Sequence, residues 1–119
     1  MTTIFILLLI KHTICDLFLQ STRPPADKSK ILGYGLHRHF LDHAVATAII
    51  LLFFIEIQYA LLFGLLDYIA HCTIDWLKHK ILKKYNVVKN GKMFWGLQSI
   101  DQSLHYITYF IIVIMIGHI

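Results

Sequence analysis

Hydrophobic residues along this chain fall into four long stretches that are separated by shorter polar segments. The stretches predict helices at about residues 3–20, 40–55, 59–77 and 100–118. Each approaches the ~20 residues that a helix needs to cross about 30 Å of hydrocarbon. A tight turn at residues 56–58 separates the second and third stretches, whereas residues 21–38 and 78–98 predict longer, basic loops. The pattern predicts an all-α, four-helix transmembrane bundle made of two tandem helical hairpins.

The composition also favours a membrane protein. Of the 119 residues, 57% are hydrophobic and only 15% are charged, whereas roughly a quarter of the residues in soluble domains are charged. A chain this short leaves much of its surface in contact with solvent, so it cannot hide so many apolar side chains in a soluble interior. The mean hydropathy is +0.64. We expect a single integral membrane domain over residues 1–119.

The first hydrophobic stretch has a length and position that are typical of a secretory signal peptide. However, no basic segment precedes it, and Lys11, His12 and Asp16 interrupt it before any small-residue cleavage site. We therefore expect a helix that is retained in the membrane.

Basic residues set the expected orientation in the membrane. Lys and Arg number 11 against 7 acidic residues, which gives a formal net charge of +4. All of the basic residues except Lys11 lie in the two predicted loops, and an excess of Lys and Arg is typical of cytoplasmic loops. With four spans, both basic loops would be cytoplasmic and both termini would lie outside. This distribution explains the positive charge without nucleic-acid binding.

Polar and ionisable side chains recur inside the predicted spans, mostly three or four residues apart, so that each set shares one helix face. They are His12, Asp16 and Gln20 on the first span, His39, Asp42 and His43 on the second, Asp67, His71 and Asp75 on the third, and Asp101, Gln102 and His105 on the fourth. At a rise of about 1.5 Å per residue, they lie within about 15 Å of the cytoplasmic ends of the spans. Because ionisable groups in hydrocarbon are unfavourable, this layer indicates a functional site.

The two halves of the chain share part of this pattern. His12-x3-Asp16 on the first span corresponds to His71-x3-Asp75 on the third, and both halves are hairpins that run in the same direction. A pseudo-twofold axis along the membrane normal would make these two polar helix faces point toward each other. We expect one shared interhelical site, although so short a match leaves an internal duplication open.

The residue types in this layer are those of a metal site. Histidine and aspartate one turn apart put a nitrogen and an oxygen ligand on one helix face, and facing helices can complete the set. Imidazole and carboxylate without a thiolate pair suit Zn²⁺, Mn²⁺ or Fe²⁺. The predicted metal ligands are His12, Asp16, His43, His71 and Asp75. We assign catalytic roles to Asp101, as a ligand or general base, and to His105, which would also be a ligand.

Four further residues have predicted supporting roles. Gln20 and Gln102 lie within helical reach of a ligand and would orient it by a hydrogen bond. Lys28 and Lys78 lie at the boundaries of the basic loops and would hold an anionic headgroup or phosphoester substrate.

A purely structural explanation competes with the metal site. Polar residues in small membrane bundles often only form hydrogen bonds between helices, which contribute about 0.6 kcal/mol on average. His39 and Asp42 lie close enough to the membrane surface to be solvated, and Asp67 is expected to pair with Lys11 near mid-membrane. The two cysteines lack the CxxC spacing of a zinc or disulfide motif and are expected to pack against neighbouring helices.

Several motifs occur in a fixed order along nearly the whole chain: His12-x3-Asp16 with Gln20, Ala26-x-Lys28, His71-x3-Asp75 with Lys78, and Asp101-Gln102-x2-His105. Their order and spacing resemble those of a family of small phage and bacterial membrane proteins, the domain of unknown function 3307. Leu17 stands where that family usually has phenylalanine, and its histidine on the second helix corresponds to either His39 or His43. The resemblance implies a multi-pass fold in the inner membrane of a bacterium or phage host, and it implies no activity.

From these residues we expect a membrane-embedded, metal-dependent hydrolase that acts on a phosphoester or lipid-like substrate at the cytoplasmic leaflet. Two non-enzymatic alternatives use the same layer. The protein is either a conduit for protons or metal ions, or an adaptor for a host membrane protein in which the layer is structural. A path through one monomer is disfavoured because the third span has no polar residue beyond Asp67, although the interface of a homo-oligomer could supply one.

Overall fold

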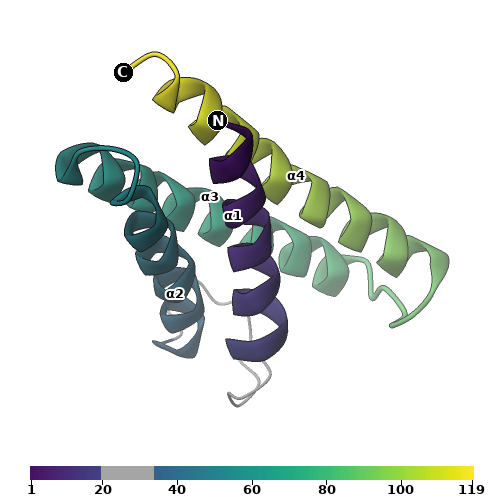
Figure 1. The fold of residues 1–119 in the computed structure, drawn as a ribbon. Helices are drawn as coiled ribbons and strands as arrows, with labels where there is room; N and C mark the ends of the chain where they lie inside the picture. Colours follow the sequence, from purple (N-terminus) through teal and green to yellow (C-terminus); the bar gives the residue numbers. More distant parts are fainter. Residues whose placement is uncertain (20–33) are drawn as a thin grey trace.

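The computed structural model describes residues 1–19 and 34–119 (Figure 1). These residues form α1 (Thr2–Thr13), the π-helix η1 (Ile14–Leu19), α2 (Tyr34–Leu51), α3 (Ile57–Lys84) and α4 (Lys92–Ile116). Within the described ranges the chain is all-helical and has no strand. This confirms the predicted fold class and the predicted number of helices.

The helices are arranged so that neighbours in sequence are neighbours in space. α2 packs on α3, α3 on α4 and α1 on α2, while contacts between α1 and α4 close the bundle (Figure 1). The two chain termini lie at the same end of the molecule, where the side chain of Met1 reaches Gly117. An even number of helices places both termini on one side, as the sequence predicts.

A glycine allows the closest helix pair to form. A Cβ atom at Gly64 of α3 would lie 2.8 Å from the backbone oxygen of Ala44 and 3.2 Å from the Cβ of Ala48, both on α2. Small residues at helix interfaces allow such close backbone approach in membrane proteins. The contact between α2 and α3 therefore depends on the absence of a side chain at Gly64.

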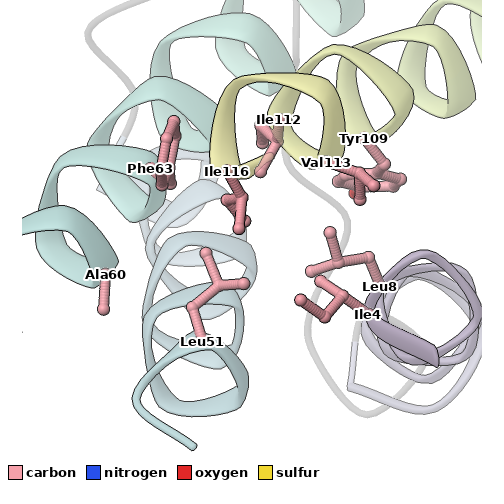
Figure 2. Close-up of a cluster of buried hydrophobic side chains, with 9 residues drawn as sticks. All are labelled: Ile4, Leu8, Leu51, Ala60, Phe63, Tyr109, Ile112, Val113 and Ile116. Atoms are coloured by element: carbon pink, nitrogen blue, oxygen red, sulfur yellow. The ribbon is translucent and has the colours of Figure 1, made fainter. Parts of the chain in front are cut away.

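The half of the bundle that contains the termini is filled by apolar side chains from all four α-helices (Figure 2). Leu8 of α1, Leu51 of α2, Phe63 of α3 and Ile112 of α4 are almost completely buried. Tyr109 is also buried there, at the edge of this cluster. Apolar packing thus holds this end together, and the buried polar and charged residues of the described chain lie outside this cluster.

Much of the protein surface is apolar, and part of the interior is polar. Large aliphatic and aromatic side chains such as Ile6, Ile10, Leu65 and Phe110 are about half exposed, while ten polar or charged residues of the described ranges are buried. Soluble proteins rarely bury so many ionisable groups or expose so much contiguous apolar surface. This distribution suits a bundle whose outer surface contacts lipid.

In the part of the chain that the structure describes, three helical segments are long and apolar enough to cross a membrane: Thr2–Leu19, Ile57–Lys84 and Lys92–Ile116. The 18 residues of α2 are not among them. At about 1.5 Å per residue, α3 is about 42 Å long, which exceeds the hydrocarbon thickness of about 30 Å. Its basic C-terminal turns can therefore extend beyond the hydrocarbon.

The helix bounds differ from those predicted, because hydropathy marks the apolar part of a helix rather than its hydrogen-bonded ends. The helix expected at residues 40–55 is α2, which ends at Leu51 and is followed by a turn. The basic segment 78–98 was predicted as a loop, and most of it is helical. Lys and Leu favour helix, and basic residues are favourable in a last helical turn. The actual connection is residues 85–91, where Asn90 adopts a left-handed φ of 66° just before α4.

Candidate metal centre

Eight histidine and aspartate side chains meet in the half of the bundle away from the termini, and we call them the His/Asp cluster. They are His12 on α1, Asp16 on η1, His39 and His43 on α2, His71 and Asp75 on α3, and Asp101 and His105 on α4. All are buried except Asp16, which has 23% of its side chain exposed. The cluster therefore opens to its surroundings at η1.

Asp16 lies at the centre of one half of the cluster. After α1 the chain continues as the π-helix η1, and π turns occur frequently at functional sites. Oδ1 of Asp16 lies 3.1 Å from Nε2 of His43, 3.4 Å from Nε2 of His39 and 3.9 Å from Nε2 of His71. Oδ2 lies 3.2 Å from Nε2 of His12. Four imidazoles thus present the same ring nitrogen to one carboxylate.

These separations are those expected between ligands of a single ion. Two ligand atoms bound to Zn²⁺ at about 2.0–2.1 Å in a tetrahedral site lie about 3.3 Å apart. The set His12, Asp16, His43 and His71 offers ligand atoms that all lie within 4.8 Å of one another. A carboxylate oxygen has lone pairs for about two hydrogen bonds, so Oδ1 of Asp16 cannot accept one from all three nearby nitrogens. The arrangement therefore fits a metal site.

A second group of ligands lies between α3 and α4. Nε2 of His105 is 3.3 Å from Oδ1 of Asp75 and 3.8 Å from Oδ1 of Asp101. The other oxygen of Asp101, Oδ2, pairs with Nζ of Lys78 at 2.9 Å and accepts a hydrogen bond from Gln102 at 3.2 Å. One carboxylate oxygen of Asp101 is thereby held in place while Oδ1 faces His105.

His71 joins the two groups. Its ring lies 3.8 Å from that of His43 and is stacked 4.0 Å from that of His105, measured between ring centroids. With His39 and Asp75 it forms a third set of atoms close enough to share an ion. The eight side chains are therefore one continuous group of potential ligands.

Several polar atoms of the cluster lack hydrogen bonds. Among the described residues, both ring nitrogens of His39 and of His71, and Oδ1 of Asp101, are buried without a hydrogen-bond partner. The 3.4 Å approach of His39 to Asp16 is close enough for an ion pair but does not have hydrogen-bond geometry. Buried polar atoms without partners are rare in proteins. A bound cation would give these atoms a partner, so the unpaired atoms fit a metal-binding role.

A charged network lies between the His/Asp cluster and the apolar half, and it adjoins the cluster because Nζ of Lys11 is 3.4 Å from Nδ1 of His43. Lys11 pairs with Asp67 at 2.7 Å, which confirms the predicted pair, and Thr47 donates a hydrogen bond to the same carboxylate oxygen at 2.6 Å. Lys11 also donates to the hydroxyl of Tyr109 at 3.1 Å, and that hydroxyl lies 2.9 Å from Nδ1 of His12. The network thus supports the ring of His12 from behind.

The structure places most of the predicted site residues together. His12, Asp16, His43, His71, Asp75, Asp101 and His105 all belong to the cluster. Gln102 contacts both halves, because its Oε1 lies 3.1 Å from Nε2 of His12 and its amide contacts Asp101. Lys78 lies at the edge of the cluster, where it contacts Asp101 and Gln98. Gln20 and Lys28 lie outside the described residues.

Three residues of this region did not enter the predicted site. His39 was expected to be solvated, which is wrong, because it is buried in the cluster together with His43. Thr47 and Tyr109 belong to the charged network. All three continue the spacing of four residues along a polar stripe, since His39, His43 and Thr47 follow one another on α2 and Tyr109 follows His105 on α4. The same periodicity places them on the polar faces of their helices, but it does not show how those faces meet.

Comparison with known proteins places the chain in one family. No curated protein and no solved structure matches it. Residues 4–119 match the family described as "Protein of unknown function (DUF3307)", which covers nearly the whole chain and confirms the resemblance seen in the motifs. The chain, an all-helical bundle with a buried His/Asp cluster, therefore belongs to the DUF3307 family.

Proposed function

We propose that this protein is a membrane-embedded, metal-dependent hydrolase that acts on a phosphoester or lipid-like substrate at the cytoplasmic leaflet. The ion would be Zn²⁺, Mn²⁺ or Fe²⁺, held by imidazole and carboxylate ligands of the His/Asp cluster. Such an ion polarises a phosphoryl or carbonyl oxygen and generates hydroxide near neutral pH.

One observation carries this proposal. Nε2 of His12, His39, His43 and His71 all lie within 3.9 Å of the carboxylate of Asp16. Hydrogen bonds between helices alone do not require four imidazoles around one carboxylate. Ionisable residues are unfavourable within a membrane, and binding of a metal ion would explain why these residues lie together.

The surroundings of the cluster favour an anionic, lipid-like substrate. Nζ of Lys78 lies 2.9 Å from Asp101 at the edge of the cluster, where it can also attract a phosphate. An apolar groove of about 320 Å³ runs between α1, η1 and α2, and its lining includes Ile14, Leu19 and Ile49. Since Asp16 is on η1, an acyl chain in this groove would end near the exposed edge of the cluster.

The same geometry disfavours a conduit through one monomer. In the described part of the chain, the polar side chains end at Thr47, Asp67 and Tyr109, and the core beyond them is apolar. Leu8 and Ile112 are fully buried in that half. A proton or ion would have no polar partner over this distance, whereas a site that opens at one end suits an enzyme.

The test uses the full chain purified in detergent. We expect a stoichiometric transition metal by elemental analysis, and hydrolysis of bis-(p-nitrophenyl) phosphate or of phosphatidic acid in mixed micelles. Asp16→Asn removes a ligand and should lower the amount of bound metal and abolish hydrolysis. Glu56→Gln removes the same charge at an exposed position in the distant turn, so it should leave both unchanged.

Two results would overturn the proposal. Protein without stoichiometric metal, whose melting temperature does not respond to a chelator, would point to a structural polar layer in an adaptor. Protein that binds metal but hydrolyses neither substrate would favour a role in metal transfer or sensing. An ion present at 100 times its Kd stabilises the folded state by about 2.7 kcal/mol, so the chelator effect is measurable.

A further inference from the structure

The His/Asp cluster contains more ligands than one ion can use. It offers eight side chains, whereas Zn²⁺ in proteins takes four ligands and octahedral ions take six. The ligands also divide by position. One complete group lies around η1, and the group of Asp75, Asp101 and His105 shares no member with it.

Each group satisfies the requirements of an ion site by itself. The first has Nε2 atoms of His12 and His43 at 3.2 and 3.1 Å from the oxygens of Asp16. The second has Nε2 of His105 at 3.3 Å from Asp75 and 3.8 Å from Asp101. Both contain carboxylate, which neutralises a cation, and imidazole, which selects a transition metal.

Residues at the junction keep the two groups in contact. The ring of His71 stacks between those of His43 and His105, with centroids 3.8 and 4.0 Å away. His71 belongs to one set of potential ligands with Asp16 and to another with Asp75. Both of its ring nitrogens, like those of His39, are buried without a hydrogen-bond partner among the described residues.

We propose that the cluster holds two divalent transition-metal ions side by side. The first ion is bound by His12, Asp16 and His43, the second by Asp75, Asp101 and His105, and His71 lies between them. This inference rests on the proposed function, because it presupposes that the cluster binds metal. It makes Asp101 a ligand through Oδ1, the oxygen that faces His105 and has no hydrogen-bond partner in the described structure.

Charge balance links the second ion to the substrate. With neutral imidazoles, the three carboxylates and Lys78 have a net charge of −2. One divalent ion makes the site neutral, whereas two give it a charge of +2, which a phosphoryl dianion can neutralise. Paired ions of this kind stabilise both the attacking and the leaving oxygen in phosphoester hydrolysis.

The experiment counts ions per chain and detects whether they are neighbours. The full chain in detergent is loaded with Mn²⁺ alone, freed of unbound metal, and analysed by elemental analysis and electron paramagnetic resonance. We expect two Mn²⁺ per chain with the signal of a spin-coupled pair. Asp16→Asn and His105→Gln should each retain one ion with the six-line signal of isolated Mn²⁺, and the double variant should retain none. His118→Gln, at an exposed position near the C-terminus, should behave as the unmodified protein.

Each remaining outcome decides between the proposals. One ion per chain that is lost in both single variants would overturn the two-ion inference and leave the hydrolase proposal intact. Two ions without spin coupling, or an ion retained in the double variant, would also overturn the inference, because one ion would then lie elsewhere. No bound ion under any loading condition would overturn the proposed function as well. If Asp16→Asn fails to fold, His12→Gln removes a ligand of the same ion.

Discussion

At the scale of single residues, the bundle contains two polar systems with different roles. The Lys11–Asp67 pair is fully satisfied, because the ammonium group also reaches Tyr109 and the carboxylate accepts a hydrogen bond from Thr47. The His/Asp cluster contains buried ring nitrogens and a carboxylate oxygen that have no hydrogen-bond partner among residues 1–19 and 34–119. A satisfied network stabilises one arrangement of helices, whereas unpaired ligand atoms are available for chemistry.

The buried ion pair should be important for the stability of the bundle. Lys11→Met leaves Asp67 charged and buried, with Thr47 as its one remaining partner among the described residues. Breaking a buried pair in this way destabilises a protein by about 3–5 kcal/mol. The double variant Lys11→Met/Asp67→Leu removes both charges and should recover most of this loss. The measurement is unfolding in mixed micelles. A double variant as unstable as the single one would contradict this account.

Gln102 should tune the affinity for metal because it contacts His12 and Asp101 at once. Hydrogen-bond partners of ligands typically change metal affinity by about 10–100-fold when they are lost. We expect Gln102→Leu to weaken binding by a factor in this range, as measured by competition with a chromophoric chelator. Gln58→Leu is the matched control, since Gln58 is exposed in the distant turn and contacts Glu56. An unchanged affinity would show that Gln102 only fills space.

At the scale of elements, two local features bring the ligands together. The π-helical turn of η1 places Asp16 within reach of imidazoles from α1, α2 and α3. Gly64 lets α3 approach α2 closely enough that a Cβ would touch the backbone of Ala44. Since Ala44 follows His43 directly, the spacing of these two helices also sets the position of a ligand.

A methyl group at Gly64 should therefore separate α2 from α3. Gly64→Ala places a Cβ 2.8 Å from the oxygen of Ala44, and overpacking of this kind destabilises by about 1–3 kcal/mol. We expect a lower melting temperature and weaker metal binding. Gly96→Ala on α4 is the control, because a Cβ there has no atom within 4 Å among the described residues, and alanine favours helix over glycine. Equal effects of the two substitutions would contradict the close-packing explanation.

At the scale of the whole molecule, the two ends of the bundle differ in composition. Both termini lie at the apolar end, and the His/Asp cluster lies toward the end where α3 finishes in basic residues. From the positive-inside rule we propose that this basic end is cytoplasmic. The site would then face the cytoplasmic leaflet.

Cysteine labelling in intact cells can test this orientation. In a background of Cys15→Ala and Cys72→Ala, Gln58→Cys should react with a membrane-impermeant maleimide from outside, and Asn90→Cys only after lysis. Both positions are exposed and lie at opposite ends of α3. Reaction of both from the same side would refute the four-span topology.

The sequence alone determined the helical class, the number of helices and the polar layer, because helical periodicity shows which side chains share one face of each helix. The common depth of Lys11 and Asp67 near mid-membrane predicted their pairing, since two opposite charges in hydrocarbon have few other partners. Helical periodicity also predicted that His12 and Asp16 share one face of their helix, as His71 and Asp75 do on theirs. These features depend only on spacing along one helix and on depth.

Only the tertiary structure decided how the stripes meet. Periodicity fixes the relative positions of residues on one helix but not the rotation of that helix about its axis or its crossing angle with its neighbours. For this reason the sequence could not establish that His39 and His43 both enter the cluster, that η1 turns Asp16 toward four imidazoles, or that Asp75, Asp101 and His105 form a group of their own. Those positions follow from close packing at Gly64 and from contacts between helices that are distant in the chain.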